Sequence, residues 1–403
     1  MSKNKFLVVC SLLLTATIFS CKKNTDAITN TEEADPILKI SNKVESDRVD
    51  VSNDGASVPF TSMETTGKSV QATAAVYPYE LIYNGKINPI KDNQNKPLSA
   101  LDVTSLGNNY FGVAYMTIGE KYYGGVDVFK LSANNNPELI SSVTSPNADI
   151  NKIKIGGNKI FLGVDLKDYE ARNFQAPAVV GMVDINNTGL QNPQYIPLKG
   201  YSVTDLDYSA ANNKLYAASA ENGGLSVISF NNGTPSLTSF SYYGALRAIA
   251  FSGSDLFASN AYSYSKFNPN TAELLNLQSW PVRSDDVQIG ALTTAPNGNF
   301  LFGNNYALIY VNKANNTLID QVDLGGWIYS ISVVNDKIYI AAGNSIVVAT
   351  IENGHLKLLA KTHFESTFGA GNFVINNVHV TGDKVVVTCG TKGTYVFTLK
   401  PKA

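Results

Sequence analysis

Cysteine is nearly absent from this sequence of 403 residues, which contains three. Cys10 lies inside an apolar N-terminal leader and Cys21 directly follows that leader, so Cys389 is the one cysteine in the rest of the chain. A single cysteine excludes an internal disulfide. Residues Val385–Cys389 have the composition of a β-strand, and we predict that the Cys389 thiol is buried and inert.

Charged residues and histidines are also scarce. Only 16% of the residues are charged and the formal net charge is −2, which excludes the basic surface that nucleic-acid-binding domains carry. The three histidines, His355, His363 and His379, have no metal-ligand spacing. We therefore expect no nucleic acid partner, no metal site and no cofactor.

No apolar run is long enough to cross a membrane as a helix. The run Phe6–Phe19 is shorter than the ~20 residues that such a helix needs. Lys3 and Lys5 precede it, so the segment has the charged start and the short apolar stretch of a secretory signal. We predict a signal peptide over residues 1–20.

The end of this leader suggests a lipid anchor. Thr17-Ile18-Phe19-Ser20-Cys21 resembles a lipobox, which implies that Cys21 carries acyl chains, each burying ~0.8 kcal/mol per CH₂ in the membrane. The following Lys22-Lys23-Asn24 is similar to the start of outer-membrane lipoproteins of Gram-negative bacteria, and of Bacteroidota in particular. We expect an outer-membrane lipoprotein that faces the periplasm or the cell surface. A simple cleaved signal with a coincidental cysteine is the alternative.

The composition changes at about residue 75. Residues 21–75 are rich in Ser, Thr, Asn, Asp, Glu and Lys, and such a segment buries too little apolar surface to become ordered. We predict a flexible, lipid-anchored tether there. From residue 76 onward, short β-branched and aromatic runs alternate with Gly and Asn turns and no helical period is sustained. We predict one all-β domain over residues 76–403.

The β-rich part contains a repeat. In its clearest copy we expect strands at Ile150–Ile155, Lys159–Val164, Ala178–Asp184 and Gln194–Leu198. The centres of the first strand of each copy are Val103, Ile153, Leu206, Ile249, Leu292, Ile331 and Val378. They recur every 39 to 53 residues, which is the period of a four-stranded propeller blade. Seven centres predict a seven-bladed β-propeller of four-stranded antiparallel blades.

The two ends of the domain predict how the ring closes. The last copy stops after its third strand, at Val396–Leu399, and an early strand, Tyr79–Tyr83, has no partner in its own copy. We predict that this N-terminal strand completes the last blade. A ring of six or eight blades and a pair of β-sandwiches are the alternatives.

One repeated motif links the domain to known families. The turn Asn213-Lys214-Leu215-Tyr216 is followed by the strand start Gly223-Gly224-Leu225. Over roughly residues 76–400 the chain resembles the seven-bladed YncE-like and LVIVD-repeat lipoproteins. The resemblance implies the fold and no particular activity. No set of residues matches the metal-binding histidine of seven-bladed lyases or the acidic groups and histidines of lactonases.

The connections between the second and third strands of the blades differ in length. The second blade has a long, mixed-charge one at Asp165–Pro177, and the first blade offers Gly119–Gly124 beside it. Loops on a rigid scaffold concentrate binding residues, and Tyr, Phe and Arg dominate binding hot spots. Our candidate binding residues on this top face are Tyr122, Tyr123, Tyr169, Arg172 and Phe174. The alternative is that they cap blade edges.

A second group of polar and aromatic residues enters the first strands and is expected at the mouth of the central channel. These residues are Asp102, Asp149, Asp205, Arg247, Asp286, Trp327, Tyr329 and Asn376. They could grip a ligand or an ion, or they could cap backbone groups and hold water.

These observations favour a binding function. We predict a lipid-anchored, monomeric propeller that binds a protein, peptide or glycan through its top face. The alternative is an enzyme, such as a hydrolase, lactonase or lyase, with its site at the channel mouth. No recognisable set of acid, base and metal-binding residues supports the alternative.

Overall fold

The computed structural model describes residues 36–43, 45–52, 55–66, 69–72, 77–186, 189–281, 291–369, 371 and 373–402. All of them lie in the second of two compact units, Pro36–Ala403. Among these residues no helix is long and apolar enough to span a membrane. The predicted signal peptide and Cys21 fall outside them.

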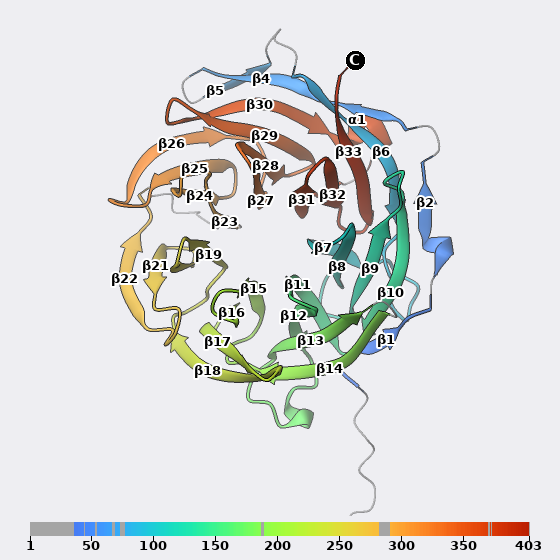
Figure 1. The fold of residues 1–403 in the computed structure, drawn as a ribbon, viewed down its shortest axis with the longest axis vertical. Helices are drawn as coiled ribbons and strands as arrows, with labels where there is room; N and C mark the ends of the chain where they lie inside the picture. Colours follow the sequence, from blue (N-terminus) through green and yellow to red (C-terminus); the bar gives the residue numbers. More distant parts are fainter. Residues whose placement is uncertain are drawn as a thin grey trace, which may run out of the picture. The chain divides into compact units, whose positions relative to one another are not determined.

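Seven antiparallel sheets follow one another around a ring (Figure 1). The strands of blades 1 to 4, from inner to outer, are β7 (Ser99–Gly107), β8 (Tyr110–Met116), β9 (Gly124–Leu131) and β10 (Pro137–Ser145); β11 (Ala148–Gly156), β12 (Lys159–Leu166), β13 (Ala178–Asn186) and β14 (Gly189–Pro197); β15 (Val203–Ser209), β16 (Lys214–Ser219), β17 (Gly224–Asn231) and β18 (Thr234–Tyr242); β19 (Ala248–Ser252), β20 (Asp255–Ser259), β21 (Ser263–Phe267) and β22 (Leu274–Ser279).

Blades 5 to 7 complete the ring. Their strands, in the same order, are β23 (Ala291–Thr294), β24 (Phe300–Gly303), β25 (Ala307–Asn312) and β26 (Thr317–Asp323); β27 (Ile328–Val334), β28 (Lys337–Ala342), β29 (Ser345–Glu352) and β30 (His355–His363); β31 (Asn377–Thr381), β32 (Lys384–Thr388), β33 (Thr394–Pro401) and β6 (Tyr79–Ile87). Each inner strand contacts the inner strand of the next blade, and β31 contacts β7. All seven predicted centres lie in inner strands, so the seven-bladed propeller is confirmed.

The ring closes between the two ends of the chain. Strand β6 pairs antiparallel with β33, from Thr394 opposite Ile87 to Pro401 opposite Tyr79. Blade 7 therefore takes three strands from the C-terminus and its outer strand from the N-terminus. The predicted closing strand is confirmed, and it extends four residues beyond Tyr83.

A bulge recurs in the outer strands. Six of the seven blades have one extra residue in the outer strand, at Asn84, Ile140, Thr238, Leu275, Ile319 and Leu359. In blade 2 the register shifts beside Asn192, whose φ is 52°. A bulge increases the local twist of a strand and bends it. The repeated bulge therefore interrupts the outer edge of every blade.

The flexible tether predicted over residues 21–75 was wrong for residues 36–43, 45–52 and 55–66, which we name the strap. Its strands run along the outer edges of three blades: β1 (Lys39–Ser41) pairs with β10, β2 (Val49–Val51) and β3 (Ser57–Pro59) pair with β6, and β4 (Thr61–Thr66) pairs with β30. Strand β5 (Ser69–Ala72) pairs with β4. The blades supply unpaired edges and apolar pockets that a free polar segment lacks, which is why the strap is ordered despite its composition.

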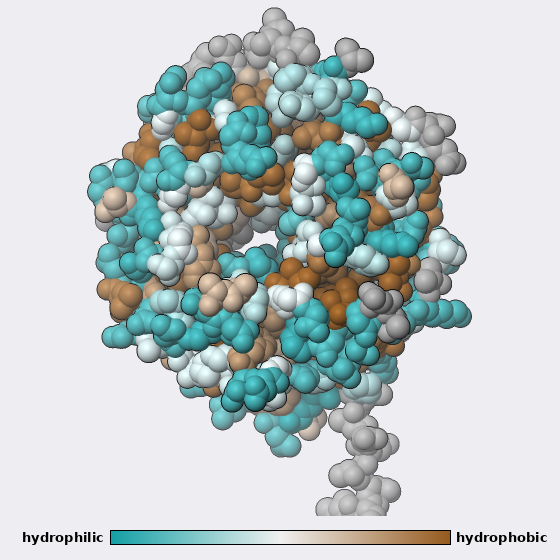
Figure 2. All heavy atoms as spheres, viewed as in Figure 1, coloured by the Kyte–Doolittle hydropathy of each residue, from teal (hydrophilic) through white to brown (hydrophobic). Residues whose placement is uncertain are grey.

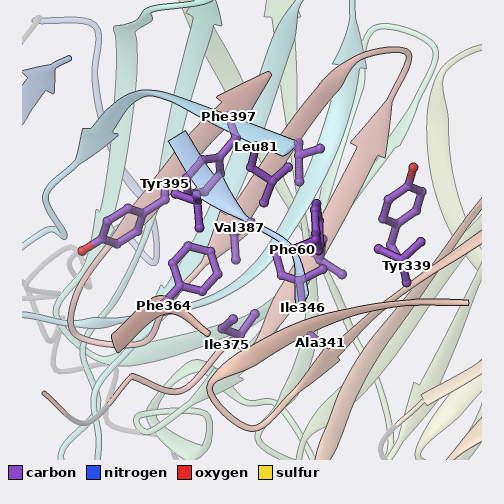
Figure 3. Packing of buried hydrophobic residues seen from close by; sticks show 14 of the residues in the cluster. Phe60, Leu81, Tyr339, Ala341, Ile346, Phe364, Ile375, Val387, Tyr395 and Phe397 are labelled. Atoms are coloured by element: carbon purple, nitrogen blue, oxygen red, sulfur yellow. The ribbon is translucent and has the colours of Figure 1, made fainter. Parts of the chain in front are cut away.

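The strap also contributes to the core. Ile37 and Leu38 pack into the cluster between blades 1 and 2, and Val58 and Phe60 pack between blades 6 and 7. Figure 3 shows Phe60 among the buried side chains of the latter cluster, near Leu81 of β6. The strap thus fills interfaces between blades as well as covering their edges.

One buried ion pair ties the strap to blade 1. The Arg48 guanidinium donates to the Asp127 carboxylate, with Nη1 3.1 Å from Oδ1, and its Nε donates to the Asn88 carbonyl oxygen at 3.1 Å. The Asp127 side chain is fully buried and also accepts a bond from the Ser142 hydroxyl at 2.7 Å. Strap and blade 1 are therefore joined by a hydrogen-bonded charge pair.

Among the described residues there is one α-helix, which the sequence did not predict. Helix α1 (Phe364–Phe368) is a single turn after the outer strand of blade 6, with Phe364 buried in the cluster of Figure 3. Five residues are too few to produce a helical period in the sequence. The predicted burial of Cys389 is confirmed, since its side chain is 1% exposed and burial raises the pKa of its thiol.

Candidate functional site

The top face carries a pocket over blades 1, 2 and 3. The connections between second and third strands and the connections between blades share this face. A cavity of about 480 Å³ lies here. It is lined by the loops between the second and third strands of blades 1, 2 and 3 and by the link between β14 and β15. This volume is within the range of small-ligand and peptide pockets.

Two tyrosines meet across this pocket. Tyr122 follows β8 in blade 1, and Tyr201 lies between β14 and β15. Their hydroxyl oxygens are 2.8 Å apart. Burial and the bond to Tyr201 raise the pKa of Tyr122, so its hydroxyl stays protonated and can donate. Tyr201 is 54% exposed, which leaves its ring available to a partner.

A third tyrosine belongs to the long loop of blade 2. Tyr169 lines the pocket, and its hydroxyl donates to the Glu170 carboxylate at 3.0 Å. It begins a short 3₁₀ turn, Glu170–Arg172, inside this loop. Lys167, Lys199 and Glu221 add exposed charges of both signs around the same cavity. The pocket therefore combines aromatic rings, hydroxyl groups and charged residues.

The five predicted top-face residues divide into two groups. Tyr122 and Tyr169 line the pocket. The other three hold the loops: the Tyr123 N–H donates to Asp149, Arg172 pairs with Asp168 at 2.9 Å, and Phe174 packs against the core between blades 1 and 2. A binding role stays a prediction for all five.

Sequence reasoning missed Tyr201. It stands alone in the short link Lys199-Gly200-Tyr201-Ser202, so no cluster of aromatic residues marked it. The available signal was its position, because this link emerges on the face that carries the long loop of blade 2.

The predicted channel-mouth residues are not gathered at one place. Asp102, Asp205, Arg247 and Tyr329 line a cavity of about 380 Å³ formed by the inner strands. Figure 2 shows the opening at the centre of the ring. Asp286 lies outside the described residues.

The other predicted mouth residues are engaged elsewhere. Asp149 accepts bonds from the Thr117 N–H and hydroxyl at 3.1 and 2.9 Å. Asn376 donates to the Ala100 carbonyl oxygen at 2.8 Å, and Trp327 packs edge-on against Tyr306. These three do not line the central cavity and instead support loops at the ends of strands.

Carboxylates of the inner strands join successive blades. The Asp102 Oδ2 of blade 1 accepts the Ile153 N–H of blade 2 at 3.0 Å, and the Asp205 Oδ2 of blade 3 accepts the Ile249 N–H of blade 4 at 2.8 Å. In blade 6 the Ser330 hydroxyl oxygen accepts the Val378 N–H of blade 7 at 3.0 Å. These residues therefore have a structural role in holding the ring together.

Inner-strand bulges direct several of these side chains. The residue before Asp102, Asp205 and Ser330 is an extra residue in the pairing with the second strand, and the same is true of Lys152 in blade 2. A bulge changes the direction in which a side chain points. In blades 1, 2, 3 and 6 the bulge is followed by a polar side chain that lines the channel. In blades 4 and 5 the first and second strands pair without a bulge, and Ala248, Ala250 and Ala291 of their first strands line the channel.

Within the described part of the chain, no three His, Cys, Asp or Glu side chains come together as metal ligands would. Of the histidines, His379 lies in β31 and lines the central cavity. Burial lowers its pKa to about 4, so it is neutral at physiological pH. The described geometry therefore supplies hydrogen-bonding, charged and aromatic groups for binding.

Comparisons with known proteins identify the fold. A chain of the crystal structure of the mitotic checkpoint complex superposes with a TM-score of 0.55 at 13% identity, over 98% of this chain and 99% of that one. Sqt1 of Saccharomyces cerevisiae gives 0.55 at 12% identity, over 87% of this chain and 98% of Sqt1. Sqt1 of Chaetomium thermophilum gives 0.52 at 12% identity, over 77% and 97%.

No protein-family model and no curated protein matches the sequence. The resemblance to the YncE-like and LVIVD-repeat families accordingly stays a prediction. At identities of 12 to 13%, structural similarity shows the fold alone. The fold is a seven-bladed β-propeller closed by an N-terminal strand.

Proposed function

We propose that this protein is a lipid-anchored binding module of the bacterial cell envelope, which holds a protein or peptide partner in the top-face pocket. The observation that carries the proposal is the meeting of Tyr122 and Tyr201 across the pocket, with Tyr169 in the same lining. Tyrosine supplies a large apolar ring and a hydroxyl group at low cost in side-chain entropy, and it is enriched at binding hot spots.

The rigidity of the site supports a binding role. Tyr169 is held by the packing of its loop on the core between blades 1 and 2, and Arg172 fixes the same loop through Asp168. A site whose side chains are already positioned loses less conformational entropy when a partner binds. The charged residues Lys167, Lys199 and Glu221 can pair with groups at the edge of a peptide.

Site-specific crosslinking in cells tests the pocket. A photo-crosslinking amino acid at position 201 is expected to give a discrete adduct with one envelope protein. The same amino acid at position 262 is the control, because Tyr262 is 84% exposed in the corresponding loop of blade 4 and does not line the pocket. Tyr122→Ala should then reduce the adduct at position 201 at least about five-fold.

Two outcomes would contradict this part of the proposal. Equal adducts at positions 201 and 262 would mean that the face has no specific site. Absence of any protein adduct at position 201, with retention of the propeller on a glycan column, would assign the pocket to a sugar instead.

The anchor is tested separately. Cys21→Ala should move the protein from the membrane fraction to the soluble fraction and abolish labelling by a fatty-acid probe. An unprocessed signal peptide could also hold the variant in the membrane, so the length of the mature chain is measured by mass spectrometry. A correctly processed variant that stays in the membrane fraction would refute the anchor.

A further inference from the structure

The central cavity has polar groups that the ring does not use. Eight side chains that are charged or can become charged line it: Asp102, Lys152, Lys154, Asp205, Asp207, Arg247, Tyr329 and His379. The three carboxylates and Lys154 have hydrogen-bonding partners inside the protein. Lys152 and Arg247 do not.

All three carboxylates are engaged. Asp102 accepts from the Ile153 N–H and from the Asn377 amide, and Asp205 accepts from the N–H groups of Ile249 and Leu206. Asp207 accepts from Lys154 Nζ at 2.7 Å and from the N–H of Tyr208 at 3.0 Å. These bonds tie the oxygen atoms to the inner strands.

Two cations keep free donors. Within the described part of the chain, neither Lys152 Nζ nor the Arg247 guanidinium makes a hydrogen bond or a close ion pair, although Asp102 and Asp205 interact with the charge of Lys152 from a greater distance. Together these groups have eight N–H donors. Burial lowers the pKa of Lys152, but the charges of Asp102 and Asp205 outweigh that effect and raise it, so Lys152 is protonated at neutral pH.

The inner strands of blades 4 and 5 leave room for a ligand. Ala248, Ala250 and Ala291 of blades 4 and 5 are small and apolar, and the cavity volume of about 380 Å³ exceeds that of a few water molecules. Free cationic donors beside small apolar side chains suit a compact molecule that carries an oxyanion on a short carbon skeleton.

We infer that the central channel binds a small oxyanion, a carboxylate or a phosphate, through Lys152 and Arg247. This site is separate from the top-face pocket and does not depend on the proposed partner. The inner-strand bulge at Asn151 directs Lys152 into the channel, so the binding group is built into the pairing of blade 2.

Calorimetric titration of the full chain tests the inference. Inorganic phosphate and succinate are titrated separately at constant ionic strength, and at least one is expected to bind saturably at one site. Lys152→Gln and Arg247→Gln should each weaken that binding at least ten-fold. Lys357→Gln is the matched control, because it removes the same charge from the outer strand β30, away from the cavity, and should change the dissociation constant less than two-fold.

The two probes distinguish the source of the oxyanion, since binding of phosphate alone indicates a phosphorylated ligand and binding of succinate alone a carboxylic acid. Saturable binding of neither anion would overturn the inference, and so would equal affinity of all three variants. If Lys152→Gln proves unstable by thermal melting, Arg247→Gln decides, because the Arg247 side chain is exposed and makes no bond that the fold needs. Crosslinking at position 201 should be the same in both channel variants, which separates this test from that of the top-face pocket.

Discussion

Two buried titratable side chains respond to pH in opposite directions. Burial raises the pKa of Asp165 to about 6, and burial lowers the pKa of His379 to about 4. The stability that Asp165 contributes is fully present below its unfolded pKa of ~3.9 and is lost as the pH rises to about 6. The stability that His379 contributes is fully present above its unfolded pKa of ~6.5 and is lost as the pH falls towards 4.

Variants should separate the two effects between pH 4 and 6.5. His379→Gln removes the loss of stability that protonation of the histidine causes. Between pH 6.5 and 4 its free energy of unfolding should therefore fall by up to about 3 kcal/mol less than that of the wild type. In Asp165→Asn the free energy of unfolding should instead fall more steeply with decreasing pH than in the wild type. Urea unfolding at four pH values measures both curves, and three parallel curves would contradict the assignment.

The loop of blade 2 contains residues with different roles. Phe174 packs against the core between blades 1 and 2, so Phe174→Ala should lower the free energy of unfolding by about 1–3 kcal/mol. Tyr201 is more than half exposed, so Tyr201→Ala should change it by no more than about 0.5 kcal/mol. Denaturant titration compares the two variants, and equal effects would show that Phe174 is not a structural anchor.

The sequence identified the right loop but not the roles within it. Aromatic residues in a long loop can point outward or pack inward, and their order along the chain does not distinguish the two. Tyr169 proved to line the pocket, whereas Phe174 and Arg172 hold the loop in place. The orientation depends on the buried cluster between blades 1 and 2, part of which is distant in sequence from the loop.

Among the elements of the fold, the strap is joined to blade 1 by the Arg48–Asp127 ion pair. Arg48→Met leaves a fully buried carboxylate without its cationic partner, which should cost about 3–5 kcal/mol of stability. The double variant Arg48→Met with Asp127→Leu removes the uncompensated charge and should recover more than half of that loss. Chemical denaturation of the two single variants and the double variant measures the coupling.

The control for these Arg48 and Asp127 variants lies on β9, the strand that contains Asp127. Lys130 of β9 pairs with Glu138 at 3.0 Å, and both side chains are well exposed. Lys130→Met should therefore change stability by less than about 1 kcal/mol. If Lys130→Met lowered the free energy of unfolding as much as Arg48→Met does, the loss of a positive charge near β9 would explain both effects and the buried pair would not.

The inner strands could be predicted and the strap could not. Each inner strand has an apolar run that recurs with the blade period, as at Ile153 and Ile331. The strap strands β1, β2 and β3 have three residues each, and β3 buries only its central Val58. One inward residue produces no period, so the segment has the composition of a tether although the blade edges order it.

The closure of the whole ring depends on the pairing of β6 with β33, which we name the seam. Removing residues 394–403 deletes β33, which separates β6 from β32 and β31 and leaves those two strands as the remainder of blade 7. We expect this truncation to abolish the cooperative thermal transition of the entire propeller, because blade 7 then loses its packing against blade 6 and against blade 1. Removing residues 402–403 is the control and should change the melting temperature by no more than about 3 °C. Calorimetry would contradict the expectation if the larger truncation still melted in one sharp transition.

The seam also fixes the order in which the molecule can form. Asn84 bonds to Thr398 across 314 positions of the chain, and Pro59 bonds to Thr362 across 303. Blades 1 to 6 have all four of their strands in consecutive order, so they can form as the chain emerges. Strand β1 can then join β10 of blade 1, whereas β4 must wait for β30 and β6 must wait for β33. Contacts over such separations are slow to form, since the entropy of closing the loop is lost before the contacts compensate for it. We therefore expect the pairing of β6 with β33 to be the slowest step of folding, and until it occurs each of these two strands has an unpaired edge that faces solvent.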